Sequence, residues 1–248
     1  MVLAKIARRI RLALPYLENP QLRRLHHQGG MVETYLKLNQ PWFQRHGFTT
    51  VLDIGANVGQ FALTVAQLLP KAQIFAFEPI PSCFNQLQQA MGSCQNFTAL
   101  NLGLGDERGE LAFECNDYTP SSSFLTMTNV HTEAFPFTQG TAQIKVKIEQ
   151  LDTIAQNLAL TEPLLIKIDV QGYEDRVLRG GEQTVRRARM LIVETSFQSL
   201  YQNQPLFKDI YQVLTDWGFS YVGALDQLPN PKTGEILQSD SIFVQRNP

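Results

Sequence analysis

Short apolar runs alternate with amphipathic segments through most of the chain, and this alternation predicts a doubly wound α/β sheet. The predicted strands are apolar along their whole length, as is typical of strands that helices cover on both faces. They are expected at 51–54, 73–77, about 97–102, 164–169 and 190–195. The predicted helices cover 59–69, 81–91, 173–188 and 206–217. Two last strands, about 219–224 and 240–245, flank the turn-rich segment 228–235.

The alternation breaks between residues 110 and 150. ELAFECND (110–117) and AQIKVKIEQL (142–151) have the pattern of strands, which predicts an antiparallel hairpin inserted into the domain. The segment between them, 119–137, is polar and carries aromatic residues, and we expect a loop there. Long loops inside compact domains are uncommon and are often lids or binding loops.

The N-terminal segment is basic and amphipathic. Residues 1–14 (MVLAKIARRIRLAL) place apolar and basic residues at helical spacing, and Pro15 ends the pattern. We expect a helix that docks on the domain or on a partner subunit; weak association with an anionic membrane is the alternative. A second short helix is predicted at 31–38. The chain is therefore divided into a helical extension, residues 1–40, and one domain, residues 41–248. The oligomeric state is left open, a homo-oligomer included.

Composition is ordinary for a globular protein, with 44% apolar and 18% charged residues, and excludes a disordered chain. The net charge of −2 gives no general attraction to nucleic acid. Cys83, Cys94 and Cys115 show the spacing of neither a disulfide framework nor a zinc site, which favours a reducing cytoplasm. No apolar run approaches the ~20 residues that span a bilayer, and no signal peptide is predicted.

The segment VLDIGANVGQ (51–60) has the pattern of a strand, a glycine turn and a helix start. Such a unit presents backbone N–H groups to a ligand, and Gly55 and Gly59 would admit that ligand closely. Dinucleotide-binding turns carry a further glycine where this chain has Asn57, so a diphosphate is disfavoured. Asp53 would repel a phosphate but could hold an ammonium group. The turn therefore favours S-adenosylmethionine (SAM), a nucleotide with an amino-acid end.

Two further segments are candidates for the nucleotide site. Glu78 ends the second strand and is placed to accept hydrogen bonds from ribose hydroxyls, after which Pro79 stops the strand. An N-cap or surface carboxylate is the alternative for Glu78. NLGLGD (101–106) follows the third strand, and we expect a flexible turn whose Leu102 and Gly103 border the adenine. A plain turn is the alternative for that segment.

The segment LLIKIDVQGYEDRVLRGG (164–181) carries charge inside a buried strand. Strand alternation places Lys167 and Asp169 on one face, with Asp169 at the carboxyl end beside the predicted pocket. An unpaired buried carboxylate is costly, so Asp169 should meet a cation, a metal or the substrate. Glu174 lies in the first turn of the next helix, where it could simply complement the helix dipole.

These segments together resemble the FkbM-type SAM-dependent methyltransferases over about residues 48–200. The resemblance rests on VLDIGANVGQF, FAFEPIP, NLGLGD, SSSF, a strand ending in LDTI, IKIDVQGYEDRVLRGG and LIVE. It implies a class I methyltransferase fold, with a mainly parallel seven-stranded sheet and an antiparallel last strand. It also implies O-methyl transfer to a hydroxyl of a sugar, polyketide or other secondary metabolite. Many relatives carry a glutamate where this chain has Gln171, which weakens any argument for a metal site.

Methyl transfer from a sulfonium requires in-line alignment, and a hydroxyl acceptor must also lose a proton. We expect Asp169 to orient the acceptor or to balance the sulfonium. Glu174 is a second candidate near it. His131, in the 119–137 segment, is a candidate base because its ordinary pKa is close to neutrality; simple exposure is the alternative. Ser121 to Phe124 could form a lid edge over the cofactor.

Two other functions compete with this interpretation. A nicotinamide-dependent Rossmann oxidoreductase is the nearest rival enzyme, although Asn57 and the inserted hairpin count against it. A SAM-binding or scaffold protein without catalysis is the other, although a chain without catalysis would be expected to lose Asp169. The identity of the acceptor cannot be read from these patterns.

Overall fold

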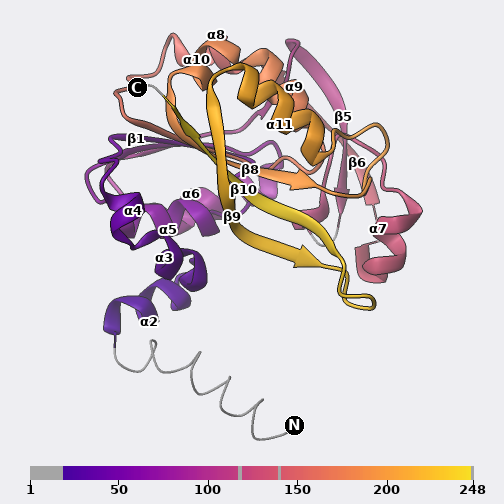
Figure 1. Ribbon diagram of the computed structural model, residues 1–248, viewed down its shortest axis with the longest axis horizontal. Coiled ribbons are helices and arrows are strands. Elements are labelled where there is room, and N and C mark those ends of the chain that lie inside the picture. Colours follow the sequence, from indigo (N-terminus) through magenta and orange to yellow (C-terminus); the bar gives the residue numbers. More distant parts are fainter. Residues whose placement is uncertain (1–18, 117–118, 139–140, 247–248) are drawn as a thin grey trace, which may run out of the picture.

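The computed structural model describes residues 19–116, 119–138 and 141–246. Its main sheet has seven strands in the order β3-β2-β1-β7-β8-β10-β9 (Figure 1). The strands are β1 (Thr50–Ile54), β2 (Gln73–Phe77), β3 (Phe97–Leu100), β7 (Leu164–Ile168), β8 (Ala188–Ser196), β9 (Phe219–Pro229) and β10 (Ile236–Gln245). The first five strands in this order, β3-β2-β1-β7-β8, pair in parallel, whereas β10 is antiparallel to both of its neighbours, β8 and β9. The predicted mainly parallel sheet with an antiparallel last strand is confirmed.

Helices cover both faces of this sheet, as the apolar strands require (Figure 1). One face carries α2 (Pro20–His27), α3 (Val32–Leu38), α4 (Pro41–Gln44), α5 (Gln60–Leu68) and α6 (Pro81–Ala90). The other carries α8 (Leu151–Ala155), α9 (Glu174–Gly180), α10 (Glu182–Arg186) and α11 (Phe207–Asp216). Neighbouring residues of one strand alternate between the two cores, as Val51 and Leu52 show.

The described part of the predicted helical extension packs into the main core. Leu22 and Leu25 of α2 and Leu38 of α3 are buried in the same cluster as Phe61 of α5. Asn19 caps α2, because its side-chain oxygen Oδ1 accepts a hydrogen bond from the Gln21 N–H at 2.9 Å. The helix expected at 1–14 lies outside the described residues. Within the described ranges, no helix is long and apolar enough to cross a membrane.

Three local expectations are wrong. The helix expected at 173–188 is two helices, α9 and α10, which are separated at Gly181, a residue with non-helical backbone angles. The segment 119–137 is not a plain loop, since it contains η1 (Thr119–Ser121), α7 (Asn129–Ala134) and the start of η2 (Pro136–Thr138). The strand expected to end at residue 151 ends at Glu149, and α8 begins at Leu151.

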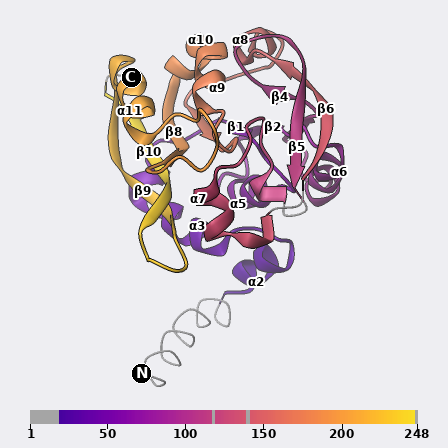
Figure 2. The ribbon, with the colours of Figure 1, turned by 90° about the vertical axis from the view of Figure 1, so that its right-hand side faces the viewer.

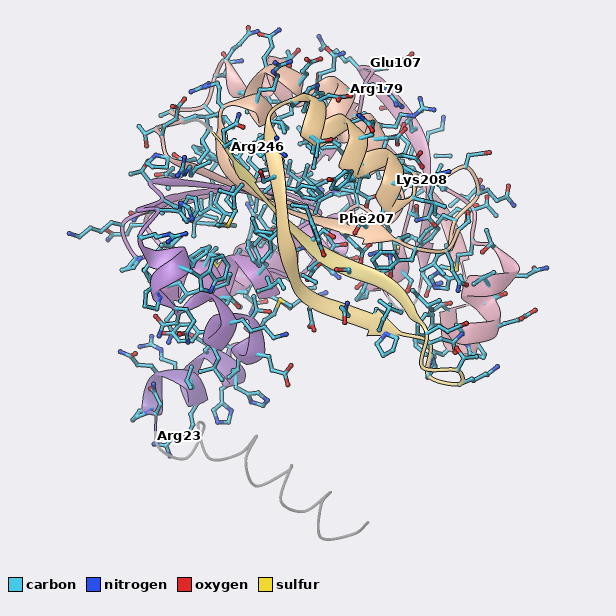
Figure 3. All side chains as sticks on the ribbon, viewed as in Figure 1. Arg23, Glu107, Arg179, Phe207, Lys208 and Arg246 are labelled. Carbon is cyan, nitrogen blue, oxygen red and sulfur yellow. The ribbon has the colours of Figure 1, made fainter. Side chains whose placement is uncertain are left out.

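The inserted hairpin forms a second sheet beside the first (Figure 2). β5 (Gly109–Asn116) and β6 (Thr141–Glu149) are antiparallel, as predicted. The segment expected as a flexible turn at 101–106 instead contains β4 (Gly103–Leu104), which pairs parallel with β6. Behind β4, the Asp106 carboxylate accepts from Arg176 and Arg179 of α9 at 3.2 and 3.1 Å. Arg179 lies on the outer surface beside Glu107 (Figure 3).

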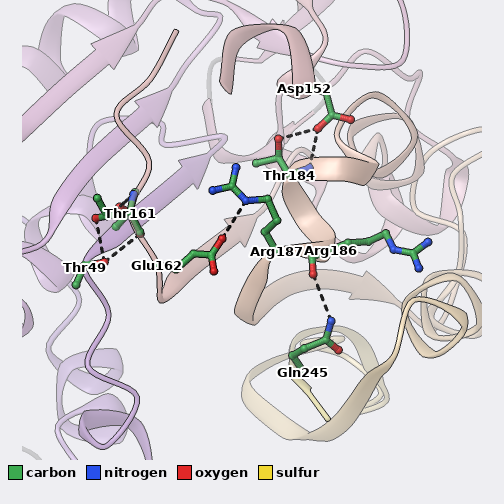
Figure 4. Close-up of polar contacts among 9 residues, drawn as sticks. Thr49, Asp152, Thr161, Glu162, Thr184, Arg186, Arg187 and Gln245 are labelled. Carbon is green, nitrogen blue, oxygen red and sulfur yellow. Dashed lines mark hydrogen bonds and ion pairs between the residues drawn. The ribbon is translucent and has the colours of Figure 1, made fainter. Parts of the chain in front are cut away.

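Polar contacts brace the edge of the sheet where the parallel strands begin (Figure 4). The Thr49 hydroxyl donates to the Thr161 carbonyl at 3.0 Å, and Arg187 pairs with Glu162 at 3.0 Å. Asp152 of α8 accepts the Thr184 N–H at 2.8 Å and so caps the start of α10. These contacts tie the segments at this edge to one another.

Candidate active site

A cavity of about 440 Å³ runs along the edge where the parallel strands end. Its lining draws on all seven strands of the main sheet or on the turns that follow them. From β3 to β9 across the sheet, these residues include Leu102, Glu78, Asp53, Asp169, Glu194, Asp240 and Leu228. The 119–138 segment covers the cavity with Ser121, Ser122, Phe124, His131, Phe135 and Phe137. The carboxyl edge of a parallel sheet is where open α/β folds bind ligands, and the volume suits a small molecule.

The glycine turn after β1 does not present its backbone donors freely. The N–H groups of Gly55 and Ala56 both donate to the Phe77 carbonyl at 3.0 Å. The N–H of Asn57 donates to Glu78 Oε2 at 2.8 Å, and Asn57 adopts a left-handed backbone with φ 49°. The expectation of free N–H groups is therefore wrong at these three positions. Because phosphate sites depend on such donors, their engagement disfavours a diphosphate.

The two glycines of this turn serve contacts within the protein. Gly55 has φ +82°, and a Cβ there would lie 1.9 Å from the Asp169 carbonyl oxygen. Gly59 has φ +96° and faces Leu87; it is not among the residues that line the cavity. Gly55 does line the cavity. Its absent Cβ lets the end of β1 approach the end of β7, where the N–H of Asp169 donates to the Ile54 carbonyl at 3.0 Å.

Replacing Gly55 by Ala should lower the free energy of unfolding by about 2–5 kcal/mol. This loss adds the cost of a left-handed backbone at a non-glycine residue to the cost of overpacking the contact with Asp169. Gly47→Ala is the matched control: Gly47 also has positive φ, but a Cβ there would meet nothing within 4 Å. Gly47→Ala should lower the free energy of unfolding by only about 1–2 kcal/mol, the cost of the left-handed backbone alone. Urea unfolding of both variants measures the difference. Equal losses would show that the approach of Gly55 to Asp169 is not close.

Glu78 is buried against the glycine turn. Its carboxylate accepts the Asn57 N–H through Oε2 and the Ile80 N–H through Oε1, both at 2.8 Å. Burial raises the pKa of Glu78 to about 7, although both backbone hydrogen bonds oppose the rise. A carboxylate has about four lone-pair sites, so two remain for a ligand. Glu78 thus lines the cavity and also fixes the shape of the turn.

Asp53 is fully buried at the floor of the cavity. Neither of its carboxylate oxygens accepts a hydrogen bond of normal geometry from a described residue. Burial raises the pKa of Asp53 to about 6, and the nearby Lys167 ammonium limits the rise. A buried carboxylate without hydrogen bonds is expensive, so a cationic group of a ligand would be well matched to it.

Asp169 belongs to a chain of polar contacts along the floor of the cavity. Lys167 Nζ pairs with Asp169 Oδ2 at 2.7 Å, so the expected cationic partner is present. Gln171 Nε2 donates to Asp169 Oδ1 at 2.9 Å and to Glu194 Oε2 at 2.7 Å. The Tyr201 hydroxyl donates to Gln171 Oε1 at 2.9 Å. Because an amide can donate to two carboxylates, Gln171 joins Asp169 to Glu194, which a glutamate there would instead repel.

The ammonium of Lys167 neutralises several carboxylates at once. Burial lowers the pKa of Lys167, but Asp169, Asp53 and Asp240 outweigh that effect, and the pKa lies above its ordinary value. Burial raises the pKa of Asp240 to about 6 against the opposing effect of Lys167. Burial and the Asp169 carboxylate raise the pKa of Glu194 well above its usual range. The floor of the cavity is therefore acidic around one cation.

Glu174 supports the site from outside the cavity lining. Its carboxylate accepts the N–H groups of Val170 and Gly172 at 3.2 and 3.1 Å, which fixes the turn after β7. Burial raises the pKa of Glu174 to about 7. Its place at the start of α9 agrees with the simpler interpretation of a carboxylate at a helix N-terminus.

His131 of α7 is buried and lines the cavity. The expectation that it is merely exposed is wrong, because its ring packs edge-on against Tyr201 and Phe135 at centroid distances of 5.2 and 5.6 Å. Neither ring nitrogen has a hydrogen-bond partner among the described residues. Burial lowers the pKa of His131, which favours the neutral imidazole near pH 7.

The remaining predicted residues also reach the cavity. Pro79, Leu102 and Gly103 line it at the end near β2 and β3. Gln238 and Asp240 of β10, which line the opposite end, are not among the predicted site residues. Their only signal is the polar run QSDS inside an apolar strand, ILQSDSIFVQ at 236–245.

The fold and this site define a class I SAM-dependent methyltransferase. A family model described as the methyltransferase FkbM domain matches residues 53–221. The chain is 30% identical over 194 residues to the 2-O-methyltransferase NoeI of Sinorhizobium fredii, covering 75% of this chain and 77% of that protein. It therefore belongs to the FkbM methyltransferase family, whose cofactor is SAM.

Two more distant similarities are also found. The chain is 29% identical over 143 residues to the hexuronic acid methyltransferase AglP of Haloferax volcanii, covering 57% of this chain and 54% of that protein. A crystal structure of an FkbM methyltransferase from Methylobacillus flagellatus aligns with 12% identity and a TM-score of 0.48, over 80% of this chain and 44% of that one.

Proposed function

We propose that the protein transfers a methyl group from SAM to a hydroxyl of a small acceptor, a sugar or a secondary metabolite. The observation that carries the proposal is the cavity that crosses the whole carboxyl edge of the sheet, with buried carboxylates on its floor. Because it crosses the ends of seven strands, the cofactor and the acceptor can be assigned to different ends of it. NoeI, by its name a 2-O-methyltransferase, and AglP, by its name a hexuronic acid methyltransferase, support an oxygen acceptor on a sugar.

The end near β1, β2 and β3 suits the cofactor. In the proposal, Glu78 uses its two remaining acceptor sites for the ribose hydroxyls. Asp53 receives the ammonium group, because its buried carboxylate accepts no hydrogen bond of normal geometry from a described residue. Pro79, Leu102 and Gly103 border the adenine, with Gly55 and Asn57 along the turn. Gly59 is proposed to affect cofactor binding only through the shape that it gives the turn. When bound, SAM supplies an electrophilic methyl group on a sulfonium.

The middle of the cavity holds the residues that would act on the acceptor. Asp169 lies at the centre of the sheet, between the cofactor end and Glu194, and is proposed to orient the acceptor hydroxyl. A neutral His131 can accept the hydroxyl proton as the new carbon–oxygen bond forms and the carbon–sulfur bond breaks. Glu174 is assigned a positioning role, because its carboxylate holds the turn that carries Asp169.

SAM binding should release protons and tighten as the pH rises from about 5.5 to 7.5. Burial raises the pKa of Asp53 and Asp240 to about 6 and that of Glu78 to about 7, so these groups are partly protonated in the free protein. A bound cation favours their ionised forms and lowers those pKa values. Each proton released makes the affinity rise by up to ~tenfold per pH unit. Calorimetric titration at pH 6 in two buffers of different ionisation enthalpy measures the release directly.

The same titration separates the rival functions. NAD should not bind, because the donors of the glycine turn are occupied. Tighter binding of NAD than of SAM would support the oxidoreductase and contradict the proposal. Binding of SAM without methyl transfer to a broad panel of sugars and phenols would support a scaffold protein.

The setting of the enzyme is part of the proposal. Cys83, Cys94 and Cys115 are free thiols, which supports a cytoplasmic location. The net charge of −2 supports a small acceptor without a nucleic-acid partner. Weak membrane association through residues 1–14 and a homo-oligomer stay open, and removal of residues 1–14 followed by liposome sedimentation tests the former.

A further inference from the structure

Unpaired polar atoms mark both ends of the cavity. Among the described residues, only a few buried side-chain polar atoms lack a hydrogen-bond partner: Asp53 Oδ1 and Oδ2, His131 Nδ1 and Nε2, Arg189 Nη1, Gln238 Nε2 and Ser239 Oγ. Three of these five residues, Asp53, His131 and Gln238, line the cavity. Buried polar groups are nearly always paired, so a ligand is expected to supply the missing partners. Asp53 lies at the cofactor end, which leaves His131 and Gln238 to a second ligand.

Gln238 and His131 reach the second end from different elements. Gln238 lies on β10, opposite Ser196 of β8 and Leu228 of β9. Asp240 follows two residues later on the same face of β10 and is paired with Glu194 of β8. His131 comes from α7, which packs through Ala134 against Leu200, Tyr201 and Leu237. Gln238 and Asp240 line the cavity towards the β9 edge of the sheet, away from Leu102 and Glu78, and His131 lines it from α7, whose Ala134 packs against the neighbour of Gln238, Leu237.

The donor and acceptor types at this end match a hydroxyl group. The Gln238 amide nitrogen can only donate, whereas a neutral imidazole has one nitrogen that accepts. A hydroxyl accepts and donates at once, so one hydroxyl, or two on neighbouring carbons, satisfies both residues. Both side chains are more than nine-tenths buried, with 4% of Gln238 and 3% of His131 exposed. A ligand that left either one unpaired would bind less tightly than one that pairs both.

The charges in the cavity disfavour an anionic acceptor. Five carboxyl groups are among the described lining residues, namely Asp53, Glu78, Asp169, Glu194 and Asp240. Lys167 is the one lysine or arginine among them, and its ammonium is already paired with Asp169 at 2.7 Å. Like charges brought together across a binding site weaken binding. An acceptor with a carboxylate or phosphate would meet that repulsion without a free cation to offset it.

Apolar side chains at the same end suit the face of a ring. Phe137 and Leu228 line the cavity and are 64% and 40% exposed, so they lie where the cavity meets solvent. Phe135 lies beside them, with its ring 6.2 Å from that of Phe137. Exposed apolar groups beside converging polar groups are typical of a small-molecule site.

We propose that Gln238 and His131, with Phe137 at the mouth, form the acceptor subsite, and that it takes an uncharged polyhydroxylated ring, a neutral sugar, in preference to an acidic one. This inference rests on the proposed methyl transfer to a hydroxyl and adds the charge and shape of the acceptor. Gln238 acts as a specificity-determining residue through its amide N–H groups. AglP, named for a hexuronic acid, would then differ from this chain in its acceptor end.

The test measures sugar binding to the protein loaded with S-adenosylhomocysteine, which cannot turn over. Methyl α-glucopyranoside and methyl α-glucopyranosiduronate differ only at carbon 6, and each is titrated by saturation-transfer NMR at pH 7.5. The same is done for methyl glycosides of fucose, xylose and galactose. We expect saturable binding of at least one neutral glycoside, and an at least tenfold weaker affinity for the glucuronide than for the glucoside. Gln238→Leu should weaken binding of the neutral glycoside at least tenfold.

A matched variant and a stability measurement separate recognition from folding. Gln227→Leu makes the same change on the exposed side of the same hairpin and should leave glycoside binding unchanged. Gln238→Leu removes an amide nitrogen that has no hydrogen-bond partner among the described residues, so its free energy of unfolding and its SAM affinity should not fall. Phe137→Ala changes an exposed side chain and should weaken the neutral glycosides without affecting the fold.

Several results would overturn the subsite. They are equal or tighter binding of the glucuronide, wild-type glycoside affinity in Gln238→Leu, and no binding of any neutral glycoside to the loaded protein. Failure of the proposed function would be distinct, because it would be seen in the calorimetric titration as an absence of SAM binding. Methyl transfer to phenols without binding of sugars would retain the proposed function and reject the neutral-sugar subsite.

Discussion

Lys167→Met is expected to lower the free energy of unfolding by about 3–5 kcal/mol at pH 8, the usual result of removing one partner of a buried ion pair. Lys167 is 6% exposed and pairs with Asp169 at 2.7 Å, and its ammonium also lowers the pKa of Asp53 and Asp240. Without it, the carboxylates on the cavity floor lose the cation that neutralises them. They would then have to stay ionised without compensation or take up protons.

The unfolding free energy lost in Lys167→Met should be larger at high pH than at low pH, because the pKa values of Asp53 and Asp240 are raised. In the wild type, burial raises the folded-state pKa of Asp53 and Asp240 from 3.8 to about 6. A group raised in this way stabilises the fold at low pH and loses that effect as the pH rises through its folded-state pKa. Removal of the cation raises the pKa of both groups further. The difference between wild type and Lys167→Met should therefore be small near pH 5 and full near pH 8.

Urea unfolding at both pH values measures this difference. Lys147→Met is the matched control, because Lys147 pairs with Glu149 at 3.0 Å through a side chain that is 56% exposed, and the buried Glu149 keeps a second cation, Arg108, at 3.3 Å. Removal of an exposed lysine from a carboxylate that keeps another cation should cost about 0–1 kcal/mol, without a strong pH dependence between 5 and 8. A loss in Lys167→Met no larger than that of Lys147→Met would show that the charges on the cavity floor are not coupled.

Glu78→Ala is expected to weaken SAM binding by at least 100-fold. The Glu78 carboxylate accepts two backbone N–H groups that shape the glycine turn, and it is proposed to hold both ribose hydroxyls as well. Hydrogen bonds to a charged group contribute about 1.5–3 kcal/mol each, so the loss of two from the complex amounts to about 3–6 kcal/mol. The turn would also lose the contact that fixes Asn57 in its left-handed backbone.

Calorimetric titration of folded Glu78→Ala with SAM checks this loss. Glu107→Ala is the control, since Glu107 is exposed on the outer surface (Figure 3) and does not line the cavity. Glu78→Gln offers a finer comparison, because its amide oxygen retains one acceptor for the turn while its amide nitrogen cannot accept from ribose. SAM affinity within a few-fold of wild type in Glu78→Ala would remove Glu78 from the proposed cofactor site.

The cofactor end could be predicted because the parallel strands repeat one rule. Asp53, Glu78 and Asp169 each lie at the end of an apolar strand, and adjacent parallel strands bring such ends to one edge. The prediction was wrong in its physical detail at the glycine turn. Gly55 lets the backbone of Asp169 come close to it, and the N–H groups of the turn donate hydrogen bonds to Phe77 and Glu78. A spacing of glycines cannot show which partner occupies a backbone donor.

The acceptor end could not be predicted for a different reason. Gln238 and Asp240 are placed by an antiparallel strand, so they reach the cavity from mid-strand and follow no rule of strand ends. His131 becomes buried only because α7 packs against Tyr201, about seventy residues further along the chain. The register of β10 against β8 and the position of α7 are tertiary facts. Sequence spacing indicates the presence of these side chains but not their common location.

The crystal structure of the protein with S-adenosylhomocysteine bound tests the central claim most directly. The account predicts both ribose hydroxyls within hydrogen-bond distance of the Glu78 carboxylate and the amino group beside Asp53. It also predicts a sulfur atom that faces Asp169 and leaves the space between His131 and Gln238 open for the acceptor. A ligand whose adenosine filled the Gln238 end, or whose ribose made no contact with Glu78, would contradict the account.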